Sequence, residues 1–408
     1  MSSLNRGRWL SLLLFTLGSV DCGGHAHEAP PMSSSQSGTG GRQDAIATVG
    51  GTTIGGASAV VVSDAGPGER LVNYLEDDRY PDDFWQKATY AESLVDGVKL
   101  EQALDAIQSH GWEVRSFLVA RNGRLVFERY GWSSGTNSAN STPHQVVPSE
   151  RQSIFSVTKS ITGALVGNAI QDGLIAGVSS TLADWFSDNS QVMSSPEKSG
   201  ITLDNLLTMR SGLTFAEGES AVFQDPKPAE SLVSRALASV PGAAWNYSSG
   251  DAHIVSEVIH RATGMTPLDY AKQKLFGPLG IIDPPWDSDA TGTNLGGFGL
   301  SLTAREMARF GELYRNGGVW ANRQVVPAAW VENATSFKCA TLWGMNYGYY
   351  WFLPSLNDFF VAIGFNGQQI FVSRNYGLVV VFTGNVPSEE ANTDYSQLIA
   401  SYVVPAMK

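Results

Sequence analysis

The residues best suited to do chemistry are a serine and a lysine three positions apart, Ser156 and Lys159. They follow the short apolar run Ile154-Phe155 and precede an amphipathic stretch of low charge, residues 161–175. This pattern predicts a turn or strand end that leads into a buried helix, with Ser156 at or near the helix start. Residues three apart on a helix share a face, so the lysine amine can reach the serine hydroxyl.

The predicted position of this pair favours a reactive serine. Burial and the positive end of the helix dipole both disfavour an ammonium ion, so both lower the pKa of Lys159. A neutral amine can accept the proton of Ser156 and make it a nucleophile. The alternative is a helix N-cap serine followed by a solvated lysine. A second Ser-x-x-Lys, from Ser195 to Lys198, is predicted to lie in a polar, proline-containing loop with no apolar run after it, and we interpret it as a coincidence.

The composition of the whole chain excludes several other classes of protein. Its 408 residues are 43% hydrophobic and 16% charged, which is typical of a globular protein with a large core. The formal net charge of -12 argues against nucleic acid or an anionic membrane surface as the main partner. The two cysteines, Cys22 and Cys339, form no disulfide framework, and the six histidines include no H-E-x-x-H motif. We therefore expect no metal and no cofactor.

The N-terminal region is typical of a targeting segment followed by a flexible tether. Residues 1–22 match an export signal, with Arg6 and Arg8 ahead of an apolar segment too short to span a bilayer. Cys22 leaves two alternatives open, a lipoprotein signal in which this cysteine carries lipid, or simple secretion. Residues 23–68 are rich in Gly, Ser and Ala and predict a flexible linker. We expect an exported protein that meets a membrane only through a lipid on Cys22.

The folded domain is expected to cover residues 69–408 and to begin with a helix and a hairpin. Residues 98–110 carry apolar positions at helical spacing. Residues 114–120 and 125–130 are then joined at Asn122-Gly123, the strongest short signal for a β-hairpin.

The rest of the domain changes from helices to strands. Residues 161–333 predict mostly helices with long loops, which we interpret as a large helical insertion. Strands are predicted near the end of the chain at residues 347–353, 359–363, 369–373 and 378–383, before a last helix over residues 389–404. The expected fold is α+β, with one antiparallel sheet flanked by helices.

Four segments in this order resemble the serine β-lactamase-like superfamily, and within it the branch of class C β-lactamases, carboxylesterases and 6-aminohexanoate-dimer hydrolases. The segments are FSVTKS, LDNLLTMRSGL, PGAAWNYSSGD and IGFNGQQIFV. The resemblance covers residues 117–408 and implies a β-lactamase/transpeptidase-like fold. It implies an acyl-enzyme on Ser156, with Lys159 and Tyr247 as its proton partners. Beside a buried cation, the pKa of a phenol such as Tyr247 is expected to be lowered.

The resemblance also implies positions that bind the substrate. Phe365, Asn366 and Gly367 align with the family's Lys/His-Thr/Ser-Gly element on a strand at the edge of the site. The backbone N–H groups of Ser156 and Gln368 would form the oxyanion hole.

Two departures from the family pattern bear on the substrate. Ser249 stands in place of Asn in the Tyr-x-Asn element. Phe365 stands where lactamases and peptidases keep a cation that helps to recognise a carboxylate. The absence of this cation favours an esterase or amidase with an apolar acyl pocket. Trp343 and Tyr347 are the aromatic candidates for the wall of the substrate cleft.

We therefore expect a serine hydrolase that cleaves a small-molecule ester or amide through an acyl-enzyme on Ser156. One alternative keeps the mechanism but makes the protein a β-lactamase or a D-amino-acid peptidase that acts on cell-wall-like substrates. Another is a non-catalytic module that binds cell-wall fragments. Such a module has no need of a nucleophile with its proton partners, so the presence of Ser156, Lys159 and Tyr247 favours the enzyme.

Overall fold

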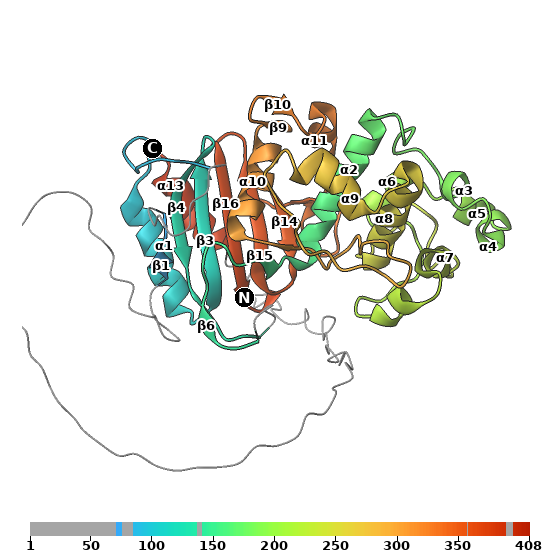
Figure 1. The fold of residues 1–408 in the computed structure, drawn as a ribbon, viewed down its shortest axis with the longest axis horizontal. Helices are drawn as coiled ribbons and strands as arrows, with labels where there is room; N and C mark the ends of the chain where they lie inside the picture. The colour runs from blue at the N-terminus through green and yellow to red at the C-terminus, as the bar shows by residue number, and fades with distance from the viewer. Residues whose placement is uncertain (1–70, 76–84, 137–140, 357, 389–394) are drawn as a thin grey trace, which may run out of the picture. The chain divides into compact units, whose positions relative to one another are not determined.

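The structure analysed is a computed structural model, shown in Figure 1. It describes residues 71–75, 85–136, 141–356, 358–388 and 395–408, which all belong to one compact unit. The expected export signal with Cys22 and the expected linker at 23–68 lie outside the described residues. Within the described ranges, no helix has both the length and the apolar character needed to cross a bilayer.

A ten-stranded sheet forms the centre of this unit (Figure 1). Its strand order is β1-β4-β3-β16-β15-β14-β13-β12-β11, with β2 beside β4. All neighbouring pairs are antiparallel except β2 with β4. The α+β prediction is therefore confirmed. The strands of the sheet are β1 (Val72–Asn73), β2 (Gln86–Lys87), β3 (Glu113–Arg121), β4 (Arg124–Tyr130), β11 (Cys339–Ala340), β12 (Asn346–Tyr347), β13 (Phe352–Leu353), β14 (Phe359–Gly364), β15 (Gln368–Ser373) and β16 (Leu378–Asn385).

The predicted hairpin is present at the turn between β3 and β4. Asn122 and Gly123 have φ of 49° and 79°, so both central residues of the turn are left-handed. This backbone twist matches the twist of the two flanking strands, and Asn and Gly adopt it more readily than other residues.

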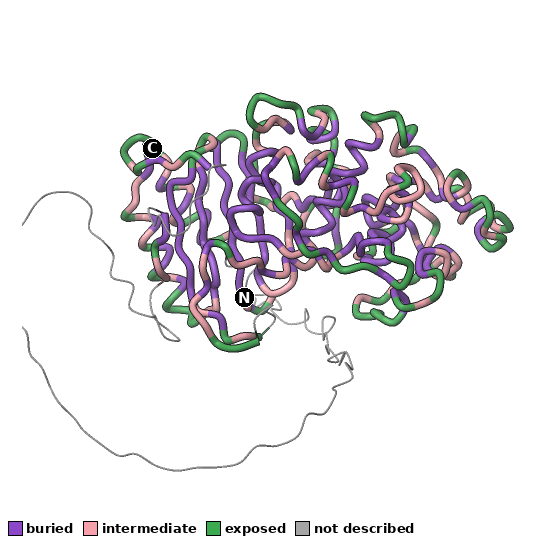
Figure 2. Tube along the Cα trace, in the orientation of Figure 1, coloured by how far each residue is buried: buried purple, intermediate pink, exposed green. Residues whose placement is uncertain are grey.

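Alternate residues of the central strands enter two separate cores. In β3, Leu118 and Ala120 join the core on one face, while Phe117 and Val119 join the core on the other. The second face is covered by α1 (Gly97–Ser109) and by the helical residues 395–406. Figure 2 shows that the central strands are buried over most of their length, as expected for a sheet covered on both faces.

Helix α10 (Ala304–Arg315) packs directly on the first face of the sheet, against β3, β15 and β16. Gly311 permits this close approach, because an added Cβ would lie 2.6 Å from Val379 Cγ1 and 2.8 Å from Ile370 Cγ2. The predicted insertion of residues 161–333 is therefore too long, since α10 belongs to the layer on the sheet.

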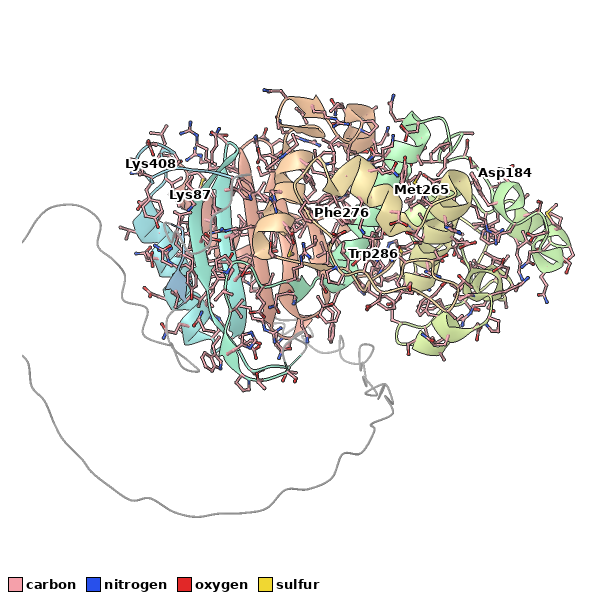
Figure 3. All side chains as sticks on the ribbon, viewed as in Figure 1. Lys87, Asp184, Met265, Phe276, Trp286 and Lys408 are labelled. Carbon is pink, nitrogen blue, oxygen red and sulfur yellow. The ribbon has the colours of Figure 1, made fainter. Side chains whose placement is uncertain are left out.

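The remaining helices form a layer beside the sheet, in which α2 and α8 pack against each other. Phe276 and Trp286 fill part of this layer, with ring centroids 6.3 Å apart (Figure 3). Other helices and short paired strands of the described residues are β5 (Trp132–Ser133), β6 (His144–Gln145), β7 (Gln152–Ser153), η1 (Phe155–Val157), α2 (Thr158–Gln171), α3 (Leu182–Trp185), α4 (Ser190–Met193), α5 (Pro196–Ser199), α6 (Leu203–Leu207), η2 (Ser220–Gln224), α7 (Pro228–Val233), α8 (Ser249–Thr263), α9 (Pro267–Ala271), η3 (Lys272–Phe276), β8 (Ser301–Leu302), β9 (Val319–Trp320), β10 (Arg323–Gln324) and α11 (Ala328–Ala334).

The strand predicted at 347–353 is wrong as one element. It is two short strands, β12 and β13, which reverse direction and pair Tyr347 with Phe352. The reversal is closed by the Gly348 N–H, which donates to the Trp351 carbonyl at 2.8 Å, and Tyr350 is left-handed with φ of 61°. The aromatic run from 347 to 353 does not reveal such a turn. Apart from Gly348, its residues carry side chains apolar enough to be buried whether the chain continues or reverses direction.

Candidate active site

Ser156 lies in the connection between a strand and a buried helix, as predicted. Strand β7 ends at Ser153, the 3-10 helix η1 carries the serine, and α2 begins at Thr158. Phe155, just before the nucleophile, is left-handed with φ of 45°. For a bulky side chain this conformation costs free energy, and such strain is often found at functional sites. Ser156 itself is partly exposed, so a substrate can reach it.

Lys159 is only 2% exposed, and its amine lies among three oxygen atoms. Its Nζ is 3.0 Å from Ser156 Oγ, 3.0 Å from Ser249 Oγ and 2.9 Å from the carbonyl oxygen of Gly297. Burial lowers the pKa of Lys159 to about 8, against an opposing effect from the negative charge of Glu217. The predicted contact between Ser156 and Lys159 and the predicted direction of the pKa shift are both confirmed.

The second Ser-x-x-Lys has a purely structural use. Ser195 is the N-cap of α5 and accepts from the Lys198 backbone N–H at 3.4 Å. The Lys198 amine points elsewhere and donates to the Ser234 carbonyl at 2.8 Å. The predicted loop is wrong, because Pro196–Ser199 form the short helix α5, but the lysine does not contact the serine hydroxyl with its amine, as expected for a coincidental motif. Ser195 therefore offers a matched control for substitutions of Ser156.

Tyr247 lies over the lysine, on the segment that leads into α8. Lys159 Nζ is 4.6 Å from the centroid of its ring. The expected lowering of the Tyr247 pKa is wrong, because burial and then the negative charge of Glu217 raise it, while a hydrogen bond with Ser156 acts in the opposite direction. The phenol therefore keeps its proton at neutral pH. In this state it can donate a proton but is a poor base.

Ser249 and Glu217 extend the site beyond the residues that were predicted to be catalytic. Ser249 was predicted as a binding residue, and the structure places its hydroxyl on the lysine amine. Glu217 accepts from Ser249 twice, from the backbone N–H at 2.6 Å and from the hydroxyl at 2.8 Å. Sequence reasoning missed Glu217, because a loop residue 32 positions before its partner carries no periodic or motif signal.

Gly297 was also missed, since it contributes only a backbone carbonyl. It lies in a glycine-rich loop against the start of α8, where an added Cβ would lie 3.0 Å from the Cβ of Ser249. The glycine thus brings the backbone close enough for its carbonyl to accept from Lys159. The glycine-rich stretch from 292 to 299 was the available signal, but it did not indicate which carbonyl is used.

The element aligned with Lys/His-Thr/Ser-Gly forms η4 (Phe365–Gly367), the tight turn between β14 and β15. Phe365 faces the nucleophile's element, with its ring centroid 5.5 Å from that of Phe155. Asn366 and Gly367 instead contact the chain after β16. The Asn366 N–H donates to Ser388 Oγ at 3.0 Å, and an added Cβ on Gly367 would lie 2.9 Å from the Tyr395 hydroxyl.

The glycine of this hairpin that meets the nucleophile's element is Gly364, not Gly367. A Cβ on Gly364 would collide with the carbonyl oxygen of Ile154, two residues before Ser156. The Gln368 side chain points to β16, where its Nε2 donates to the Gly384 carbonyl at 2.6 Å. The oxyanion hole made by the backbone N–H groups of Ser156 and Gln368 stays a prediction.

An aromatic cluster covers one side of the reacting groups. Trp343 is 43% exposed, and its ring centroid lies 5.1 Å from that of Tyr247 and 5.0 Å from that of Trp245. Its position agrees with a role in contacting the substrate. Tyr347 is only 1% exposed and packs behind the cluster, 4.8 Å from Phe352, so the prediction that it lines the open site is wrong for this conformation.

Comparison with known proteins agrees with this geometry. A sequence profile of the Beta-lactamase family matches residues 100–402, which is most of the chain. The chain belongs to this family. It is 23% identical over 311 residues to the 6-aminohexanoate-dimer hydrolase of Paenarthrobacter ureafaciens, across 67% of this chain and 73% of that protein.

A further relative and a solved structure of similar fold are esterases by name. The chain is 28% identical over 152 residues to the lovastatin esterase of Penicillium rubens, across 32% of this chain and 38% of that protein. The crystal structure of a family VIII carboxylesterase superposes with a TM-score of 0.62 at 17% identity, covering 75% of this chain and 96% of that one. The family assignment and the site together identify a serine hydrolase of esters or amides.

The charges around the site are mainly negative. Besides Lys159 and Glu217, the buried Asp251 lies on the first turn of α8 and accepts from Ser211 Oγ at 2.8 Å and Ser248 Oγ at 3.1 Å. Burial raises the pKa of Asp251 to about 7. Among the residues that the structure describes, no group of three or more His, Cys, Asp or Glu side chains is arranged to hold a metal ion.

Proposed function

We propose that this serine hydrolase is an esterase or amidase whose substrates carry an uncharged, largely apolar acyl group. The observation that carries the proposal is the contact of Ser156 Oγ with a buried amine 3.0 Å away, since the pKa of that amine is lowered to about 8. An appreciable fraction of the amine is then neutral near pH 7. Only the neutral amine can accept the serine proton.

Acylation follows from the positions of three side chains. Ser156 Oγ attacks the carbonyl carbon of the substrate while its proton passes to Lys159 Nζ. The tetrahedral intermediate then collapses, the bond to the leaving group breaks, and the leaving oxygen or nitrogen takes a proton from the Tyr247 hydroxyl. The phenol recovers a proton from the Lys159 ammonium, which returns the amine to its neutral state.

Deacylation uses the same groups with water in place of the serine. Water gives a proton to the Lys159 amine as its oxygen attacks the acyl carbon. The bond to Ser156 Oγ breaks, the serine oxygen takes a proton from the Lys159 ammonium 3.0 Å away, and the carboxylic acid leaves with the amine neutral again. No step requires a group from outside the chain other than substrate and water.

The surroundings of Ser156 support an apolar substrate. Phe155 and Phe365 contact each other on the side of the nucleophile, and Trp343 lies beside Tyr247. Besides Lys159, the charged groups described above are the acids Glu217 and Asp251. A substrate carboxylate close to Ser249 would be repelled by the negative charge of Glu217. The esterase names of one relative and one solved structure point in the same direction.

A paired assay tests this proposal. Hydrolysis of a short-chain nitrophenyl ester and of a chromogenic cephalosporin is measured for wild type, Ser156→Ala and Ser195→Ala. We expect ester turnover that falls at least about 1,000-fold in Ser156→Ala and is unchanged in Ser195→Ala. We expect little cephalosporin turnover in any of them. Faster turnover of the cephalosporin than of the ester would make the protein a β-lactamase, and no Ser156-dependent turnover of either substrate would remove the esterase and leave an amidase or a binding module.

We also propose that the protein is exported. The proposal rests on the N-terminal pattern alone, namely Arg6 and Arg8, the apolar segment after them, and Cys22. Fractionation of bacterial cells that express the full chain, with the mass of the mature N-terminus, tests it. Lipid mass on Cys22 that disappears in Cys22→Ser indicates an anchored form, cleavage without lipid indicates secretion, and an intact N-terminus in the cytoplasm contradicts export.

A further inference from the structure

The three partners of Lys159 do not have equal hydrogen-bonding capacity. The carbonyl oxygen of Gly297 can only accept. The hydroxyls of Ser156 and Ser249 can each donate one hydrogen and also accept. A charged ammonium has three hydrogens and can donate to all three oxygens. A neutral amine has only two hydrogens, so one partner must donate to its lone pair.

Which partner donates decides whether the amine can act as a base toward the nucleophile. If Ser249 donated to the amine, the lone pair of Lys159 would point away from Ser156. The hydroxyl hydrogen of Ser249 is, however, already used, because it is donated to Glu217 Oε2 at 2.8 Å. Ser249 can then only accept from the lysine. With Gly297 also accepting, Ser156 is the one remaining partner that can donate to the neutral amine.

We propose that Glu217 is a positioning residue that, through the Ser249 hydroxyl, directs the lone pair of Lys159 toward Ser156. This role deepens the proposed function and rests on it, since it concerns the base that activates the nucleophile. Glu217 does not contact the reacting atoms. It sets the direction of a chain of hydrogen bonds that runs from Ser156 to Lys159, on to Ser249 and from there to Glu217.

The loop that carries Glu217 packs closely against the start of α8, which keeps the carboxylate next to Ser249. Phe215 packs onto Gly250, where an added Cβ would lie 2.8 Å from its ring, so only glycine at this position lets the loop come so close to α8. Glu217 Oε1 accepts the backbone N–H of Ser249 at 2.6 Å, at the first residue of α8. A carboxylate is favoured there because the N-terminus of a helix carries partial positive charge.

A double-mutant cycle on kcat/KM separates positioning from a structural role. The variants are Glu217→Gln, Ser249→Ala and the two combined, assayed with the nitrophenyl ester. Glu219→Gln is the matched control, because it removes the same charge from the same loop, where Glu219 pairs with Arg235 at 2.6 Å. Thermal unfolding of each variant shows whether it folds.

We expect Glu217→Gln to lower kcat/KM at least about tenfold, as is typical when a group that orients a reacting residue is lost. Adding it to Ser249→Ala should change kcat/KM less than twofold, because its effect passes through the missing hydroxyl. Glu219→Gln should leave kcat/KM unchanged. Glu217→Gln should also move the acidic limb of the pH profile to lower pH, since the negative charge that raises the pKa of Lys159 is gone.

Three results would overturn the role of Glu217 while leaving the proposed function standing. They are a folded Glu217→Gln enzyme with wild-type kcat/KM, equal losses from Glu217→Gln in the presence and absence of the Ser249 hydroxyl, or an equal loss in Glu219→Gln. Absence of Ser156-dependent turnover in the wild type is a different outcome, because it would remove the proposed function itself.

Discussion

The activity should depend on pH through Lys159. Its pKa is lowered from 10.5 to about 8, so its neutral fraction at pH 7 rises from about 0.03% to about 10%, a gain of roughly 300-fold, or about 3 kcal/mol. Because the neutral amine is the base, kcat/KM should rise tenfold for each pH unit below 8 and level off above it. At pH 6 it should be about 100-fold below the plateau.

The measurement is the initial rate of ester hydrolysis at substrate concentrations well below KM, from pH 5.5 to 9.5. Under this condition the rate reports the pKa of the free enzyme. Lys159→Arg should be inactive throughout this range, because a guanidinium cannot lose its proton there. Asp251 needs a control of its own, because burial raises its pKa to about 7, close enough to be mistaken for the lysine. In Asp251→Asn the rise of kcat/KM with a midpoint near pH 8 should persist.

Two outcomes would refute this reasoning. A rate that stays level down to pH 6 would mean that no base with a pKa near 8 is needed for acylation. If the dependence of kcat/KM on pH disappears in Asp251→Asn, the titrating group is that carboxyl group. The charge state of Lys159 would then have no effect on the rate. A shift of the midpoint by one unit in either direction would keep the mechanism and change only the size of the burial effect.

Three further predictions concern the wall of the site and the stability of the fold. Phe365→Lys should raise turnover of carboxylate-bearing esters relative to neutral ones by about tenfold, and an unchanged ratio would place carboxylate recognition elsewhere. Gly311→Ala should lower the free energy of unfolding by about 1–3 kcal/mol, measured in urea, because the added methyl overlaps Val379 and Ile370; an unaltered midpoint would mean that α10 moves away at no cost. Asp251 has a folded pKa of about 7 against 3.8, so its carboxylate destabilises the fold increasingly as pH rises from 4 to 7. Asp251→Asn should therefore raise Tm more at pH 8 than at pH 4.5, and an equal change at both would contradict this.

The features predicted well from the sequence depend on neighbours in the chain. Ser156 and Lys159 are three residues apart at a helix start, so their contact follows from local geometry. The Asn122-Gly123 turn likewise needs only its own backbone conformation. The prediction for residues 347–353 failed because hydrophobicity marks burial but not chain direction. The pKa of Tyr247 was predicted with the wrong sign because burial and the negative charge of Glu217 outweigh the hydrogen bond with Ser156, and the motif alone does not show the position of Glu217.

The contact between Ser249 and Glu217 shows why a substitution in a motif is hard to interpret alone. An asparagine at this position of the Tyr-x-Asn element would offer an amide oxygen, which can only accept a hydrogen bond. A hydroxyl at this position is shorter and can also donate, so it becomes a reliable acceptor only when another group takes its hydrogen. Glu217 takes that hydrogen from a loop 32 residues earlier in the chain. The apparent loss of a family residue is thus offset by a second residue that no alignment of the motif includes.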